Sequence, residues 1–432
     1  MFKKIRIALW GNLTKKELLE FGMLAATLFI ILGSYWLMKP LKDAVFMKTV
    51  GRLYLPYAKI ASFLVIFPLI LIYSKLVDLV EKQKLFYIIC SCYSLIFLVI
   101  SLLLTHNTIG LANTNPSPKR IIGWILYVAI ETFGSLLVTL FWSFVVSSTD
   151  VSSAKRGYPL ILAGAQIGAI CGPSIAIHAP LFGIPTLTLA IAISVMLIPI
   201  LIKIFITLYP ATAEAHIPDE EKTGPLEGIK LLFSHKYLLG ILGVATLFDI
   251  IASILEYQLD FLADITYHSA EKITSFIGYL GLTTNSLSLV FAVFGTGFLI
   301  RQLGLTFCLV LFPIVTALAV CNVLVFPTIW ILFASVVIIK ALSYALNNPS
   351  KEIMYIPTSR DVKFKTKSWI DMFGLRTTKA IGSGINMCFT QFTDLIMYGS
   401  LVSFGVIGIW IAAAFYVGKT NKKLIESGQI IK

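Results

Sequence analysis

The chain has 432 residues, of which 57% are hydrophobic and 13% carry a charge, and its mean hydropathy is +0.88. A soluble globular chain carries about 25% charged residues. This composition excludes a water-soluble globular protein and indicates a chain solvated by lipid. The formal net charge is +13.

Apolar stretches bounded by charged, Pro or Gly clusters predict twelve membrane-spanning helices, because a spanning helix needs roughly 20 apolar residues. In chain order, the predicted spans lie at about 18–45, 57–80, 85–105, 120–147, 158–178, 186–209, 237–261, 273–299, 303–326, 328–349, 367–393 and 398–418. No pattern of short alternating strands indicates a β-barrel. The fold class predicted from these spans is an all-α polytopic membrane protein.

One long polar stretch, from Pro210 to Lys236, interrupts the series between the sixth and seventh spans. It predicts an N-terminal six-helix half at 1–209, a cytoplasmic linker at 210–236, and a C-terminal six-helix half with a short cytoplasmic tail at 237–432. Six plus six helices around a central polar loop is the layout of major-facilitator-type transporters, whose substrate binds near the bilayer midplane between the halves.

The distribution of Lys and Arg predicts the orientation. With the N-terminus inside, 23 basic residues fall in cytoplasmic segments, and the outer loops hold only Lys48, Arg52, Lys119, Arg120 and Lys272. This is a strong positive-inside bias, with both termini cytoplasmic. The net charge is therefore mostly a topology signal, and a nucleic-acid partner is not needed to explain it.

Ionisable side chains at membrane depth are costly and mark candidate sites. The basic residues that the loops do not account for are Lys39, Lys42, Lys59, Lys203, Lys340, Arg376 and Lys379. The acidic residues at similar depth are Asp43, Glu131, Asp249, Glu256, Asp260 and Asp371.

The first cluster combines two lysines with two aromatic rings. Lys39 and Lys42 are three residues apart and follow Tyr35 and Trp36 in the first span. Two ammonium groups beside aromatic rings suit a ligand that has phosphates and a base. The alternative is a snorkelling lysine near the outer interface.

Four further residues stand out in the other spans. Glu131 and Glu256 lie within the fourth and seventh spans, where each needs a partner and a lysine across the bundle is the obvious one. A purely structural ion pair is the alternative. Arg376 and Lys379 precede Gly382-Ser-Gly384, whose small residues leave room for a ligand. They also suit simple helix packing, with Lys379 at a helix end.

Other motifs exclude several functions. All six cysteines lie in apolar stretches without a C-x-x-C pair, so we predict no metal site and no cofactor. Gly418-Lys-Thr420 looks like the end of a phosphate loop, but Ala413 occupies the first glycine position and no strand precedes it. No convincing catalytic constellation is found, so we expect a transporter and not an enzyme. A lipid flippase or membrane enzyme is a remote alternative.

Several blocks in order resemble the bacterial and plastidic ATP/ADP translocase family, over about Leu18 to Gly418. The blocks are Met38-Lys-Pro-Leu-Lys-Asp43, Glu131-Thr-Phe-Gly134, Ala154-Lys-Arg-Gly-Tyr158, Leu255-Glu256, Lys351-Glu-Ile-Met-Tyr-Ile-Pro357, and Ile370-Asp371 leading to Lys379. The fifth block is the most specific, being very close to the family's K-E-M-A-Y-I-P. The chain departs from the pattern at Phe133, where the family has Trp.

The resemblance implies ATP/ADP exchange in a bacterial inner membrane by a carrier that we expect to work as a monomer. It places the family's critical charges on Lys42, Glu131, Glu256 and Lys379. In the mechanism we hypothesise, Lys42 and Lys379 bind phosphates, and the glutamates pair with them when the site is empty or accept hydrogen bonds from the base and the ribose. Tyr35, Trp36 or Trp142 stacks the base, and Lys39 and Arg376 add charge. Strict exchange follows if unpaired lysines keep the empty carrier from reorienting. The alternative is proton-coupled uptake of other nucleotides or NAD.

Overall fold

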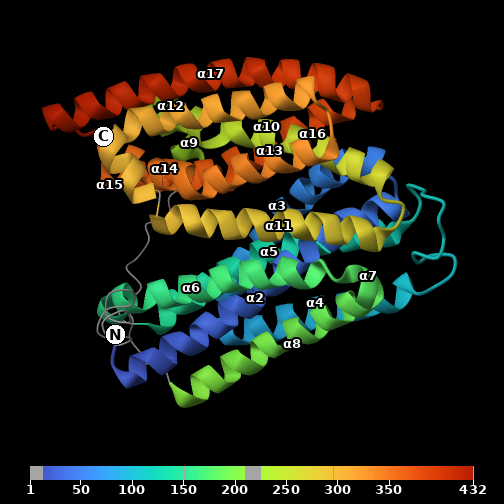
Figure 1. Ribbon diagram of the computed structural model, residues 1–432. Helices are drawn as coiled ribbons and strands as arrows, with labels where there is room; N and C mark the ends of the chain where they lie inside the picture. The colour runs from blue at the N-terminus through green and yellow to red at the C-terminus, as the bar shows by residue number, and fades with distance from the viewer. Residues whose placement is uncertain (1–12, 150, 210–224, 295, 432) are drawn as a thin grey trace. The chain divides into compact units, whose positions relative to one another are not determined.

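The computed structural model describes residues 13–149, 151–209, 225–294 and 296–431 (Figure 1). These residues form helices joined by loops, and the described part of the chain holds no strand beyond one isolated bridge between Thr358 and Ile431. Eleven described helices are long and apolar enough to cross a membrane. The predicted all-α polytopic fold is thereby confirmed.

The predicted eleventh span, 367–393, differs from the other eleven. It is helical as three successive segments, which are α15 (Arg360–Trp369), a π-helical turn (Ile370–Gly374) and α16 (Leu375–Met387). It is not one of the eleven helices that length and composition mark as able to cross a membrane, and it carries the charged residues Asp371, Arg376 and Lys379. Each of the other predicted spans coincides with a described helix or a run of helical segments, and their ends differ by up to nine residues.

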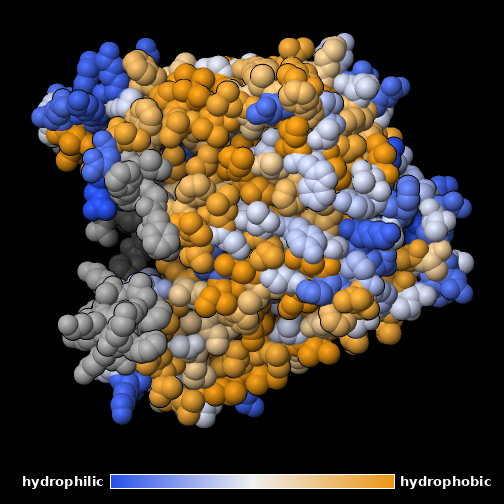
Figure 2. Space-filling view, in the orientation of Figure 1, coloured by the Kyte–Doolittle hydropathy of each residue, from blue (hydrophilic) through white to orange (hydrophobic). Residues whose placement is uncertain are grey.

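Large apolar side chains cover the outward surfaces of the helices. Leu102 is 66% exposed, Ile193 58% and Leu401 56%, and Figure 2 shows hydrophobic residues over most of the visible helix surfaces. Surfaces of this kind are stable when lipid covers them. The chain is a multi-pass integral membrane protein.

The described residues fall into two compact units. The first contains α2 (Lys15–Thr49), α3 (Leu55–Leu79), α4 (Lys82–Leu104), α5 (Ile121–Ser148), α6 (Val151–Ala176), the short α7 (Ala179–Phe182) and α8 (Ile184–Leu208). It also includes Tyr267–Leu282, which covers the first half of α11 (Ala270–Phe294). The Ser275 hydroxyl of this segment donates a 2.7 Å hydrogen bond to the Ile177 carbonyl at the end of α6.

Close approach of α2 and α6 gives the first unit its centre. A Cβ atom on Gly168 of α6 would lie 2.5 Å from the Phe29 carbonyl oxygen, and one on Gly172 would collide with the Gly33 carbonyl oxygen. Glycine is therefore required at these α6 positions, where the two backbones touch. Without a hydrophobic driving force between helices in lipid, such backbone contact is what holds membrane helices together.

A buried arginine organises the loop between α4 and α5. The Arg120 guanidinium donates hydrogen bonds to the carbonyl oxygens of Lys48, Ile109, Gly110, Asn113 and Asn115. Only 9% of Arg120 is exposed. The guanidinium thus replaces the backbone partners that this irregular segment cannot make by itself.

The second unit comprises Glu220–Thr266 and Thr283–Lys432. Its helices are α9 (Pro225–Ser234), α10 (Lys236–Thr266), α12 (Thr296–Val325), α13 (Ile329–Leu342), a π-helical turn (Ser343–Asn347), α14 (Asn348–Met354), α15, α16 and α17 (Phe392–Ser427), together with the second half of α11. Within this unit α10 packs against α13, α16 and α17. Its acidic residues Glu256 and Asp249 meet lysines of α13 and α16.

Candidate functional site

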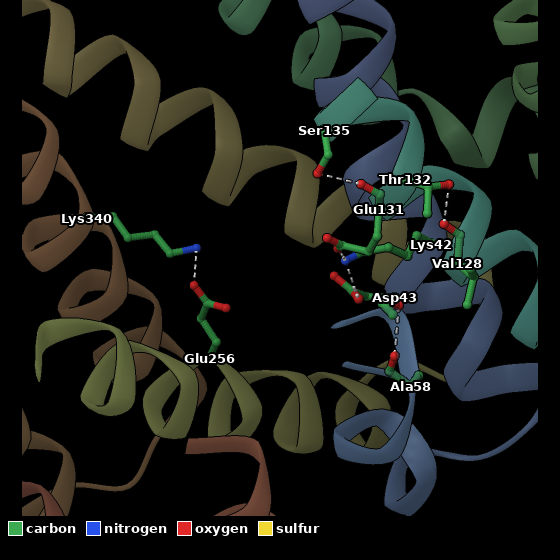
Figure 3. Close-up of polar contacts among 10 residues, drawn as sticks. Lys42, Asp43, Ala58, Val128, Glu131, Thr132, Ser135, Glu256 and Lys340 are labelled. Carbon is green, nitrogen blue, oxygen red and sulfur yellow. Dashed lines mark hydrogen bonds and ion pairs between the residues drawn. The ribbon is translucent and has the colours of Figure 1, made fainter. Parts of the chain in front are cut away.

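The first unit brings Lys42 and Glu131 together. Lys42 of α2 donates a hydrogen bond to the Glu131 carboxylate of α5 and lies 3.5 Å from the Asp43 carboxylate (Figure 3). The side chain of Lys42 is 5% exposed, whereas that of Glu131 is 30% exposed. The predicted partner of Glu131, a lysine across the bundle, is therefore Lys42.

Neighbouring residues fix this pair in place. The ammonium of Lys42 lies 4.3 Å from the ring centroid of Tyr127, which is one turn before Glu131 on α5. Such cation–π contact stabilises a desolvated ammonium by about 2 kcal/mol. Next to Glu131, the buried Thr132 accepts a 2.8 Å hydrogen bond from the Tyr93 hydroxyl of α4. The Glu131 carboxylate thus projects from α5, and the next residue on this helix is hydrogen-bonded to α4.

The predicted aromatic residues fall into two groups. Tyr35 and Trp36 have ring centroids 6.4 Å apart, and the Lys39 ammonium lies 4.7 Å from the centroid of Trp36. A Cβ atom on Gly134 would collide with the Tyr35 ring, so this glycine lets the ring reach α5 one turn after Glu131. Tyr35 is close enough to interact electrostatically with Lys42, whereas Trp36 lies against Gly172 of α6.

Trp142 is in the second aromatic group, with Tyr158 of α6 at a centroid distance of 5.5 Å. It follows Glu131 by eleven residues on α5, a separation of about 16 Å along the helix axis at 1.5 Å per residue. The structure does not bring Trp142 next to the Lys42 pair. Phe133, the departure from the family pattern, is fully buried against Tyr93 and does not face this site.

In the second unit Glu256 pairs with Lys340. The Glu256 carboxylate of α10 lies 2.6 Å from the Lys340 ammonium of α13, and Figure 3 shows the two side chains pointing toward one another. The lysine side chain is 14% exposed and the glutamate side chain 31%. Lys340 is one of the basic residues predicted to lie at membrane depth, and it is not one of the residues predicted to bind the substrate.

Lys379 makes a different contact from the one hypothesised. Its ammonium on α16 lies 3.7 Å from the Asp249 carboxylate of α10, and it is the aspartate that pairs with it here, in place of Glu256. Lys379 is 65% exposed and Asp249 15%. Arg376, one turn earlier on α16, is half-buried. Lys351 interacts electrostatically with both Asp249 and Lys379.

A weak signal for Lys340 is present in the sequence. It is the single ionisable residue of α13, an otherwise apolar helix of 14 residues. Asp249 lies seven residues before Glu256, so both carboxylates face the same side of α10, about 10 Å apart along the axis. The pattern therefore indicates two acidic positions on one face, but it does not say which basic residue each one meets.

Comparison with known proteins places this arrangement in a family. A family model described as TLC ATP/ADP transporter matches residues 1–421. ADP,ATP carrier protein 3 of Rickettsia bellii is 23% identical over 501 residues, with 98% of each chain covered. Chloroplastic ADP,ATP carrier protein 1 of Arabidopsis thaliana is 25% identical over 467 residues, covering 93% of this chain and 73% of that one.

Two solved transporters share the fold. A bacterial homologue of the iron transporter ferroportin in an inward-facing state matches with a TM-score of 0.65 at 14% identity, covering 92% of this chain and 98% of the other. The nucleoside transporter NupG matches with a TM-score of 0.58 at 14% identity and the same coverage. At such identities the likeness shows the fold alone, which is that of major-facilitator-like transporters. With the family model matching nearly its whole length, the chain belongs to the TLC ATP/ADP transporter family.

Proposed function

We propose that this chain is a carrier, not an enzyme, and that it exchanges ATP for ADP across a bacterial inner membrane by alternating access. The family match over residues 1–421 carries the proposal. The relatives named ADP,ATP carrier protein support the choice of solute. Ionisable side chains within otherwise apolar helices support transport of a charged solute, since such residues are costly unless they serve a pathway.

The most exposed of the critical charges is the best candidate for first contact with phosphate. Lys379 is 65% exposed, and its ammonium is a compact charge on a flexible stem that suits phosphate oxygens. Arg376 lies one turn earlier on α16, and we propose that it assists Lys379. The Lys42 side chain is more buried than that of Glu131, so we propose that phosphate reaches Lys42 only when the Glu131 carboxylate moves aside.

For the base, the favoured residues are Tyr35 and Trp36, with Lys39 beside them. Their rings lie on the same helix as Lys42, one to two turns before it, and Lys39 already makes a cation–π contact with Trp36. Adenine stacking on such a ring is worth about 1–3 kcal/mol in other nucleotide-binding proteins. Trp142 is a less favoured alternative because of its distance along α5.

The remaining parts of the proposal concern topology and assembly. The positive-inside bias supports cytoplasmic N- and C-termini. We propose that the transport halves divide at the polar linker 210–236, into 1–209 and 237–432, and that one chain suffices for function. No resident cofactor or metal is invoked, because ion pairs and aromatic rings supply the binding chemistry.

Proton-coupled uptake of other nucleotides or NAD is the second candidate. The observation that favours it is the partial exposure of Glu131 and Glu256, at 30% and 31%, which leaves each carboxylate within reach of a proton. Dissipating the proton gradient separates the two mechanisms. Exchange persists under an uncoupler, whereas symport stops.

The decisive experiment is uptake of labelled ATP into proteoliposomes with and without internal ADP. Exchange predicts uptake that rises with internal ADP and is abolished in Lys379→Ala. The matched control is Lys203→Ala, since Lys203 is an exposed lysine at membrane depth on α8 that forms no part of the proposed site. Absence of ATP uptake by the wild-type chain would discard the solute, and a panel of other nucleotides and NAD would follow.

A further inference from the structure

The two units contain matching ion pairs with opposite polarity. In the first unit the lysine, Lys42, is on α2 and the glutamate, Glu131, is on α5. In the second unit the glutamate, Glu256, is on α10 and the lysine, Lys340, is on α13. These helices are the first and fourth predicted spans of each half. The same pair of helix positions is thus joined by one lysine and one glutamate in both halves.

In each pair, the more buried partner is determined by residue type and not by which of the two helices carries it. In both pairs the lysine is the more buried partner and the carboxylate is about twice or more as exposed. A carboxylate has two oxygens and about four acceptor sites, so pairing with the lysine leaves acceptor capacity on its accessible side. A group that enters therefore meets the carboxylate before it meets the ammonium. Lys379 and Asp249 show the reverse order, with the lysine outermost.

We propose that Lys340 is a positioning residue for Glu256, and that the Glu256 carboxylate accepts hydrogen bonds from the nucleoside part of the substrate. The inference rests on the proposed function and deepens it. Ribose hydroxyls and the exocyclic amine of adenine are the donors of such a substrate. The ammonium holds the carboxylate ionised and fixes its rotamer, because an isolated carboxylate in a low-dielectric region takes up a proton.

The helix around Lys340 supports a functional role. Immediately after α13 the chain makes the π-helical turn Ser343–Asn347. Such turns insert one residue into a helix and are frequent at functional sites. The turn changes the register between Lys340 and the K-E-I-M-Y-I-P block beginning at Lys351. A lysine serving only to join two helices would not require this interruption.

The test is a double-mutant cycle on purified protein in proteoliposomes. Lys340→Ala and Glu256→Gln are each expected to lower the maximal rate of ATP/ADP exchange about tenfold or more, and the double variant no further than the worse single variant. Residues that act as one unit give non-additive losses of this kind. Lys340→Arg should restore most of the exchange, because it keeps the charge behind the carboxylate. Lys203→Ala is the matched control and should equal wild type.

Two results would overturn the inference. One is exchange by Lys340→Ala at the wild-type rate. The other is a double variant whose loss is the product of the two single losses, since Lys340 would then act independently of Glu256. If the wild-type chain carries neither ATP nor ADP, the proposed function fails by itself. The same cycle is then scored with whichever solute the wild-type chain transports, and the same two results decide the role of Lys340.

Discussion

Lys42 and Glu131 should respond very differently to neutralisation, although they form one ion pair. The cluster joins the single ammonium of Lys42 to the two carboxylates of Glu131 and Asp43. Glu131→Gln leaves a balanced pair of Lys42 with Asp43, and glutamine still offers an oxygen to the ammonium. Lys42→Met leaves two carboxylates side by side with their shared cation removed.

The magnitudes follow from the distances and burial. Unit charges 3.5 Å apart, the separation of Lys42 from Asp43, attract by roughly 5 kcal/mol before desolvation at an effective dielectric constant of about 20. Glu131→Gln keeps this attraction, and we expect it to cost only about 1 kcal/mol. Lys42→Met loses it and should cost about 3–5 kcal/mol, the range for breaking a buried pair. Both variants should lose transport.

Thermal unfolding in detergent, followed by tryptophan fluorescence, measures these stabilities, and proteoliposome exchange measures function. Lys203→Met controls for loss of a lysine at membrane depth. Adding Glu131→Gln to Lys42→Met should recover part of the lost stability, because one of the two uncompensated carboxylates is removed. Equal destabilisation by the two single variants, or greater destabilisation by Glu131→Gln, would refute the reasoning.

Three further predictions concern single side chains. Arg120→Ala should destabilise the loop between α4 and α5 by roughly 2 kcal/mol or more through its orphaned carbonyls, which limited proteolysis of that loop would detect. Gly168→Leu should abolish folding because the new side chain would collide with the α2 backbone. The control is Gly405→Leu on α17, which should insert normally because the space around its Cβ position is open. The amount of each variant recovered in the membrane fraction measures the difference. Trp36→Ala should raise the KM for ATP about tenfold through lost stacking, with Lys39→Ala giving a smaller rise.

The sequence was sufficient for the membrane fold because apolar length and charge bias are local properties. Runs of about 20 apolar residues mark the spans wherever they occur. The region 367–393 was also predicted as a span, and it is helical from Arg360 to Met387. Its π-helical turn at Ile370–Gly374 could not be foreseen, because inserting one residue in a helix leaves no periodic pattern in a segment already mixed with charges.

The partners of the ion pairs were harder to predict than the identity of the charged residues at membrane depth. Glu256 needs a basic partner, and Lys340 and Lys379 both belong to helices that pack against α10. Side-chain reach and helix rotation decide between them, and neither can be read from spacing along the chain. In the structure Lys340 forms an ion pair with Glu256, and Lys379 forms one with Asp249. Burial likewise comes only from packing, and it distinguishes Lys340, whose side chain is 14% exposed, from Lys379, whose side chain is 65% exposed.

These pairings change the account of strict exchange. The sequence-based hypothesis requires unpaired lysines to hold back the empty carrier, yet Lys42 and Lys340 are both paired within their own halves. Exposed Lys379 pairs with Asp249, and we expect this carboxylate to replace a phosphate when no substrate is bound.

Asp249→Asn tests this idea, because it removes the negative charge while keeping the shape of the side chain. The empty carrier would then hold Lys379 without that carboxylate, and its reorientation should become more costly. We expect ATP/ADP exchange to persist while net ATP uptake into vesicles lacking ADP falls, and the ratio of the two rates measures the change. An unchanged ratio would show that Asp249 does not replace phosphate, and that the barrier to empty reorientation lies in other contacts of the carrier.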